Sequence, residues 1–278
     1  MTTAQRVIKY LAIALAIFII LNIISMIVFG IYIFADILGL RDGNKIEQIS
    51  SNKNITTSFE DSDIQALKID MYATNLTIKQ GSSFKIETTN KNVEYKQNRN
   101  QLEIIEKKHN WFSQNVQENL IIYIPTGVTF EKVDIETGAG QIEIDKLYTE
   151  KLSLEVGAGK VKIQELKTIE TADIDGGAGK VEILNGTMKN LDLDMGVGEC
   201  SITTKLTGNN KINAGIGKLE INLTDSKENY KIRVNKGIGS IKINGKEMTN
   251  DEIYGSGNNF IRIDGGIGTI DVKNIGEF

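Results

Sequence analysis

The feature that most constrains the fold is a Gly-x-Gly element with an apolar middle residue, which occurs seven times between residue 138 and the C-terminus. The first five elements are 19 or 20 residues apart, and the last two spacings are 22 and 29 residues. The glycines are Gly138, Gly140, Gly157, Gly159, Gly177, Gly179, Gly196, Gly198, Gly215, Gly217, Gly237, Gly239, Gly266 and Gly268. A repeat of about 20 residues cannot bury an apolar face alone, so it predicts a solenoid of stacked coils.

Apolar residues alternate at fixed positions on both sides of each glycine pair. Counted from the first glycine, positions +4 and +6 are apolar in every repeat, and positions −5 and −3 are apolar except at Asn210. Such alternation in β-branched residues predicts two short strands per repeat, each with one buried face, joined by a turn at the glycines. Equivalent strands of successive repeats should then pair in parallel, and an antiparallel stack of hairpins is the alternative.

The middle residues of the glycine elements are expected to continue the inward row. They are Ala139, Ala158, Ala178, Val197, Ile216, Ile238 and Ile267. Each coil would then bury them against the next coil in the stack.

The same frame occurs once more upstream, in residues 66–78, but without glycines. Leu67 and Ile69 precede a Tyr-Ala-Thr turn, and Leu76 and Ile78 follow it. Since terminal repeats are often atypical, we interpret this segment as a degenerate first coil. Four further strand-like stretches separate it from the glycine repeats, at residues 84–87, 93–95, 102–105 and 120–125.

The amino terminus predicts a membrane anchor. Residues 11–35 are apolar apart from Asn22 and Ser25, which is long enough to span a bilayer and too long for a cleaved signal peptide. Arg6 and Lys9 precede this span, so the positive-inside rule places the N-terminus in the cytoplasm and the C-terminal domain outside the cell membrane. We expect a cytoplasmic N-terminus and signal anchor in residues 1–42, a polar linker in 43–64, and an all-β, right-handed parallel β-solenoid in 65–278.

Residues suited to catalysis are scarce. The chain has one histidine, His109, in a polar stretch, and one cysteine, Cys200, at a position where other repeats have Val, Ile or Leu. We interpret His109 as a surface side chain and Cys200 as a packing residue. No metal-ligand or nucleophile motif occurs, and a net charge of −4 disfavours nucleic acid. The sequence therefore predicts no enzymatic activity, no cofactor and no metal centre.

The outward positions −4 and −2 change from acidic to partly basic along the repeats. The candidate partner surface consists of Glu136, Glu155, Asp173, Asp175, Asp192 and Asp194, and the later repeats carry Lys211, Arg233 and Arg262. A solvated face balanced by nearby lysines is one interpretation, and divalent cation binding and partner docking are the others. Trp111 and Phe112, in the irregular stretch before the repeats, are a second candidate, for recognition or for covering the end of the solenoid.

One family resemblance rests on residues 66–78, on Ile121 to Gly127, and on Val133 to Ile135 leading into the Gly138 repeat. These segments resemble the putative adhesin domain family of bacterial envelope proteins, whose function is unknown, over residues 60–278. The layout is also similar to accessory proteins of Lia-type envelope-stress systems. The resemblance implies a non-catalytic binding or scaffold module at the cell envelope, with another envelope protein or cell-wall glycan as its partner. The alternatives are a direct adhesin for a glycan or surface ligand, and a polysaccharide-acting enzyme.

Overall fold

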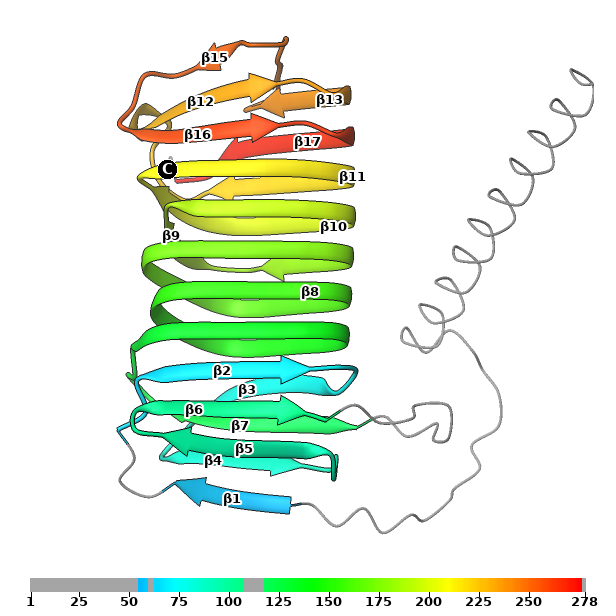
Figure 1. Cartoon of the computed structure of the whole chain (residues 1–278). Coiled ribbons are helices and arrows are strands. Elements are labelled where there is room, and N and C mark those ends of the chain that lie inside the picture. Colours follow the sequence, from blue (N-terminus) through cyan, green and yellow to red (C-terminus); the bar gives the residue numbers. More distant parts are fainter. Residues whose placement is uncertain (1–54, 60–62, 108–117, 277–278) are drawn as a thin grey trace, which may run out of the picture. The chain divides into compact units, whose positions relative to one another are not determined.

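The computed structural model describes residues 55–59, 63–107 and 118–276, and almost all of its regular structure is β-strand (Figure 1). The strands are β1 (Ile55–Phe59), β2 (Ala66–Met71), β3 (Asn75–Gly81), β4 (Phe84–Thr88), β5 (Val93–Asn98), β6 (Gln101–Glu106), β7 (Asn119–Pro125), β8 (Phe130–Ile183), β9 (Gly186–Lys189), β10 (Leu191–Thr207), β11 (Asn209–Leu223), β12 (Tyr230–Asn235), β13 (Ile238–Ile243), β14 (Lys246–Glu247), β15 (Ile253–Tyr254), β16 (Asn259–Asp264) and β17 (Ile267–Asn274). A 3-10 turn, η2, covers Lys227–Asn229.

The predicted membrane span, residues 11–35, lies outside the described residues. Within the described ranges, no helix has the length and apolarity needed to cross a membrane. The predicted linker, 43–64, contains strand β1, which pairs antiparallel with β4.

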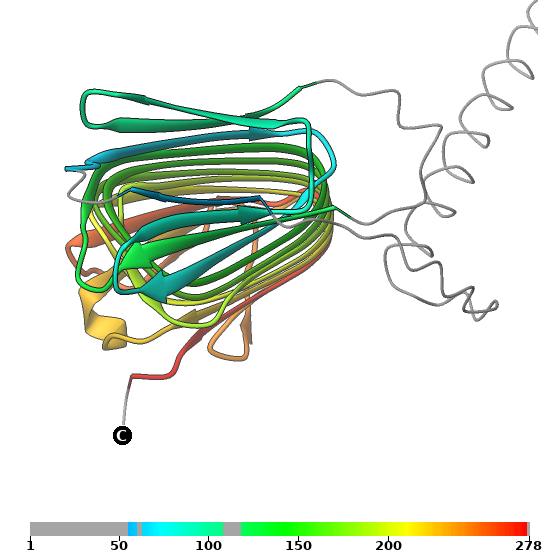
Figure 2. The ribbon, with the colours of Figure 1, turned by 90° about the horizontal axis from the view of Figure 1, so that it is seen from below.

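The glycine repeats form a stack of coils whose strands lie in parallel register. Strand β8 runs for 54 residues through successive coils, and β10 pairs with it so that Leu193 lies beside Ile174 and Gly198 beside Gly179. Strand β11 continues this register on β10. Viewed along the stack, the coils lie over one another (Figure 2). The prediction of an all-β fold with parallel, stacked coils is confirmed for these repeats.

The predicted inward positions form the core. Positions +4 and +6 are buried in all seven glycine coils, from Ile142 and Ile144 to Ile270 and Val272. The apolar residues at −5 and −3 are buried as well. Asn210, the polar exception, also points inward with only 2% of its surface exposed. Its side-chain oxygen accepts from the Leu191 amide at 3.0 Å and its amide group donates to the Phe260 carbonyl at 3.1 Å, so its burial leaves no polar atom unpaired.

The expected inward direction of the glycine-element middle residues is wrong. Val197, Ile216, Ile238 and Ile267 are half to three-quarters exposed, whereas Thr137 and Val156, the residues just before two of the elements, are buried. The second glycine of each element has a φ near +140°, as at Gly198 and Gly217, which turns the chain and shifts the phase of the alternation. The middle residue therefore lies on the outside of the turn. We call this turn position the corner of the coil, and the middle residue the corner residue.

The order of coils at the C-terminal end differs from their order in the sequence. Strands β16 and β17 pair with β11 on one side and with β12 and β13 on the other. The last repeat therefore lies between its two predecessors, and the expected pairing of successive repeats is wrong at this point. We number the glycine coils by position in the stack: coils 1 to 5 have their corners at Ala139, Ala158, Ala178, Val197 and Ile216, coil 6 at Ile267, and coil 7 at Ile238.

At the N-terminal end, too, a coil lies between two others in an order that differs from the sequence. The upstream coil of β2 and β3 pairs with coil 1, as predicted from its frame, with Leu67 beside Val133 and Leu76 beside Ile142. It is not the end of the stack, however, because β6 and β7 pair in parallel with its other edge. The antiparallel strands β1, β4 and β5 lie beyond (Figure 1).

Candidate functional site

The acidic candidate residues lie on one face of the stack, on the strands that lead into the corners. Glu136, Glu155, Asp173 and Asp175 are on β8, and Asp192 and Asp194 are on β10. Parallel pairing places Asp192 beside Asp173 and Asp194 beside Asp175, so four carboxylates occupy adjacent positions. Coils in parallel pairing are spaced by about 4.8 Å, which brings these like charges close together.

Electrostatic strain is concentrated at Asp173. Burial raises the pKa of its carboxyl above the ordinary value of 3.8, and the charges of Asp175, Asp192 and Asp194 raise it further. Lys211 acts in the opposite direction. A carboxylate that is disfavoured in this way gains from any cation that approaches the face.

A basic region follows on the same face. Lys211 on β11 lies beside Arg262 on β16, which lies beside Arg233 on β12. Each cation has a carboxylate partner in the chain: Lys211 with Asp192 at 3.4 Å, Arg262 with Asp264 at 2.8 Å and Arg233 with Asp251 at 3.1 Å. These pairs are largely exposed, so water weakens them and they can exchange partners at low cost.

The structure gives the acidic face no metal-binding geometry. Among the described residues, no group of three or more His, Cys, Asp or Glu side chains is arranged to hold a metal ion. The outward residues at positions −4 and −2 form regularly spaced rows that are acidic at one end of the stack and partly basic at the other. This geometry is suited to binding another charged surface.

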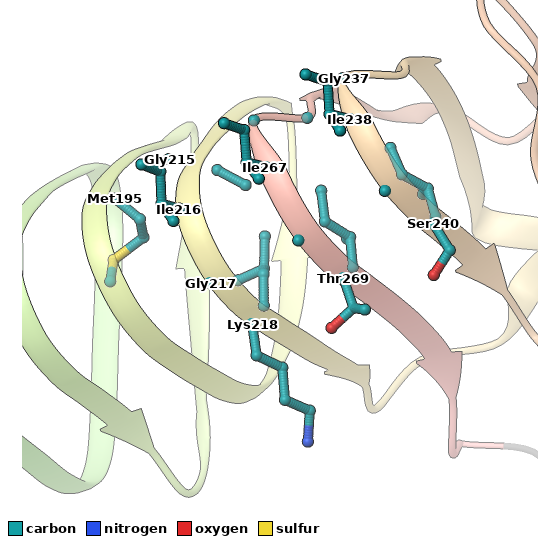
Figure 3. Close-up of a pocket in the computed structure, with 18 of the residues that line it drawn as sticks. Met195, Gly215, Ile216, Gly217, Lys218, Gly237, Ile238, Ser240, Ile267 and Thr269 are labelled. Carbon is teal, nitrogen blue, oxygen red and sulfur yellow. The ribbon is translucent and has the colours of Figure 1, made fainter.

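An exposed apolar ridge runs along the corners next to this face, and sequence reasoning missed it. Val197, Ile216 and Ile267 are 52%, 51% and 50% exposed, and Ile238 is 73% exposed. Pairing places them in the line Val197, Ile216, Ile267, Ile238, and Figure 3 shows the last three along the corner edge. The flanking positions must be glycine, since a Cβ on Gly217 would lie 1.9 Å from the Gly198 carbonyl oxygen. The corner residues therefore have no side chains directly beside them in the chain.

Beneath this ridge lies a hollow of about 390 Å³, including space open to solvent (Figure 3). It forms because the inward corner positions of coils 5 and 6 are the small residues Ala214 and Gly265, whereas coil 2 has Val156 there. Met195, Lys218 and Lys236 also line it. Its walls are mainly glycine backbone and aliphatic groups, which lack the convergent acids and bases of a catalytic site.

A buried carboxylate organises the N-terminal end. Glu106, 7% exposed, accepts from the amides of Tyr72, Ala73 and Thr74 at 2.7, 3.1 and 3.3 Å, and from the Asn90 side chain at 2.8 Å. Tyr72 to Thr74 form the turn that replaces Gly-x-Gly in the upstream coil. Glu106 thus satisfies backbone donors at that turn, and its role is structural.

Of the remaining candidate residues, Cys200 lies within the described part of the chain and the other three do not. Cys200 is buried in the core, and burial raises the pKa of its thiol to about 12, so the packing interpretation is confirmed. His109, Trp111 and Phe112 lie outside the described residues, and both interpretations of the aromatic pair stay open.

Comparisons with known proteins point to one family. The family model described as Toastrack DUF4097 matches residues 64–261. Two solved structures are similar: a putative cell adhesion protein from Clostridium sporogenes, with 16% identity, a TM-score of 0.33 and coverage of 80% of this chain and 99% of that one, and a putative adhesin from Bacteroides fragilis, with 16% identity, a TM-score of 0.40 and coverage of 81% and 98%. No curated protein matches.

Proposed function

The chain belongs to the Toastrack DUF4097 family, and from this premise we propose that it is a non-catalytic binding or scaffold module held at the bacterial cell envelope. The observation that carries the proposal is the face on coils 1 to 4, where Asp173, Asp175, Asp192 and Asp194 are adjacent. These carboxylates are outward and regularly spaced, and they outnumber the lysine paired with them among the described residues, Lys211 at 3.4 Å from Asp192. A basic surface of a partner protein is therefore the ligand that suits them.

The location of the module is part of the proposal. Residues 11–35 have the composition of a single membrane span, and the positive charges before it favour a cytoplasmic N-terminus and an extracytoplasmic C-terminal domain. A right-handed winding of the coils remains a prediction. Protease added to intact cells should degrade an epitope tag placed after Phe278 and leave a tag before Met1 intact. Protection of the C-terminal tag would contradict this orientation.

The binding role is tested by charge reversal on the acidic face. In cells that express the full chain, Asp175→Lys combined with Asp194→Lys should reduce crosslinking to a native partner about tenfold, because like charges meet across the contact. The control is Glu143→Lys with Glu182→Lys, which reverses two carboxylates on the strand after the corner. Equal effects of the two double variants, or no effect of either, would contradict a role for the acidic face.

The identity of the captured partner separates the candidate roles. A membrane protein captured through the acidic face would support a scaffold in envelope-stress signalling. Binding of the chain to isolated cell wall, unaffected by the reversal, would support a direct adhesin instead. Turnover of a cell-wall polymer would support an enzyme, for which the described surface offers no set of catalytic groups.

A further inference from the structure

Two properties change together along one edge of the stack. The corner residue is Ala in coils 1 to 3, Val in coil 4 and Ile in coils 5 to 7. The neighbouring face is acidic in coils 1 to 4 and carries Lys211, Arg262 and Arg233 in coils 5 to 7. The half with small corners is therefore the acidic half, and the half with large apolar corners is the basic half.

We propose that this edge is the interface between two copies of the chain that lie antiparallel across a two-fold axis. The inference rests on the proposed function, because it identifies the basic surface that the acidic face binds as the basic half of a second copy. A two-fold axis makes the same patch serve both partners, so each half must complement the other half.

The axis that fits both properties passes between coils 4 and 5. Coil 4 of one copy then faces coil 5 of the other, coil 3 faces coil 6, and coil 2 faces coil 7. Since all coils have the same spacing of about 4.8 Å, a register that is right at one coil is right along the whole contact.

The corners match in size in this arrangement. Ala178 faces Ile267 of the second copy, and Ala158 faces Ile238, so each large side chain enters the space above a small one. Val197 and Ile216, which are 52% and 51% exposed in the single chain, meet near the axis. The bare glycines on both sides of each corner let the two edges approach closely. Contact would remove the ridge from water, which favours association.

The charges match as well. Asp192 faces Lys211 of the second copy, and Asp173 faces Arg262. Burial and the neighbouring carboxylates disfavour the ionised form of Asp173, which gains a guanidinium partner in this arrangement. In the row next to the corners, Asp194 faces an amide, Asn213.

One pair of like charges remains, Asp175 opposite Asp264. The Arg262 guanidinium that faces Asp173 also lies 2.8 Å from the Asp264 carboxylate, so this shared cation offsets part of the repulsion between Asp175 and Asp264. A parallel arrangement is worse throughout, because it would place Ile on Ile, alanine on alanine, and the acidic halves together.

The proposal is tested with two differently tagged copies of the full chain expressed together. One copy carries Ala178→Cys and the other Ile267→Cys, and membranes are treated with a short bismaleimide. Antiparallel pairing predicts a crosslinked species that contains both tags. The control pair, Ala178→Cys in both copies, should give about tenfold less crosslinked product, because coil 3 of each copy faces coil 6 of the other and the two Ala178 corners therefore lie three coils apart. The native Cys200 is buried and does not interfere. A control yield equal to or above the mixed yield would overturn the arrangement.

A charge exchange gives an independent test without cysteines. One variant carries Asp173→Lys and Asp192→Lys, and the other carries Lys211→Glu and Arg262→Glu. Each variant alone should lose self-association about tenfold or more, since like charges then meet, whereas a mixture of the two should restore a heterodimer in sedimentation measurements. Failure of the mixture to associate overturns the proposal. If a foreign partner is still captured through Asp175 and Asp194 while no dimer forms, the proposed function stands and this inference alone fails.

Discussion

At the scale of single residues, the end of the stack depends on one buried acid. Glu106 accepts three backbone amides and the Asn90 side chain. Glu106→Ala should lower the free energy of unfolding by about 3 kcal/mol, because buried donors lose a charged acceptor. Glu103→Ala, which removes a partly exposed ion pair with Lys68, should cost less than about 1 kcal/mol. Urea unfolding of both variants measures the difference, and equal midpoints would contradict it.

The direction of the corner residue is a second residue-scale prediction. Val156→Asp places a charge at an inward position that is 5% exposed, and it should destabilise the chain by about 3 to 5 kcal/mol. Ala158→Asp, two residues later on the outer edge of the corner, should change stability by less than about 1 kcal/mol. Thermal unfolding checks both variants. A larger loss for Ala158→Asp would restore the inward interpretation.

Asp173 also predicts a pH dependence. Its pKa is raised in the folded state, so the folded chain holds a proton that the unfolded chain releases, and stability falls as pH rises from 3.8 through the raised value. Asp173→Asn should therefore raise the melting temperature at neutral pH. The gain should be less than the equivalent of about 1 kcal/mol, because the carboxylate is only partly buried and water screens its charge. The gain should vanish below pH 3.8.

Glu252→Gln should lower the melting temperature at neutral pH, the opposite of the Asp173 change, since Lys246 and Thr249 lower the pKa of Glu252 to about 2 and stabilise its charged form. Thermal melts as a function of pH test both signs.

The error about the corner residues could have been avoided from the sequence. Inward positions −3 and +4 are separated by seven residues, an odd number, so alternation with a period of two cannot run through the turn. The phase must change at the glycines, and the middle residue then has no fixed direction. The strands themselves were predictable, because apolar residues two positions apart, at +4 and +6, point to the same side of a strand and mark that side as the buried face.

At the scale of elements, the inserted C-terminal coil can be tested by truncation. A chain that ends at Asn258 lacks β16 and β17, the only described parallel partners of β12 and β13. Residues 227–258 should then become sensitive to protease, while coils 1 to 5 stay resistant because each contacts mainly its neighbours. A chain that ends at Leu223 is the control and should show the same resistant core. Protection of 227–258 in the longer chain would mean that coil 7 moves onto coil 5.

The sequence contains little information about this insertion. The longer spacings of 22 and 29 residues, which accommodate the 3-10 turn and strands β14 and β15, are its only trace. Both orders of coils satisfy the same inward pattern, since Ile232 and Ile261 present equivalent side chains at position −5. The pattern therefore predicts that the coils stack, and only the backbone pairing decides which coils are neighbours.

At the scale of the whole molecule, a stack of equivalent coils should tolerate the loss of one complete coil. Deletion of residues 158–177 joins Gly157 to Ala178 and restores a Gly-Ala-Gly corner. This variant should keep its β-structure and unfold cooperatively, because stability in such an array is a sum over neighbouring repeats. Deletion of residues 158–167 removes half a coil, breaks the register and should abolish folding. Circular dichroism distinguishes the two. A folded half-coil variant would contradict the equivalence of the coils.

The placement of the upstream coil between two others has a mechanical consequence. A pull applied to the chain before Ile55 first strips β1, which pairs only with β4 among the described strands. The load then reaches β2, whose backbone is bonded to β6 on one edge and to β8 on the other. Removing β2 requires both rows of hydrogen bonds to break under the same force. The stack therefore cannot unfold one strand at a time from this end. A tether attached here would transmit tension into the structure.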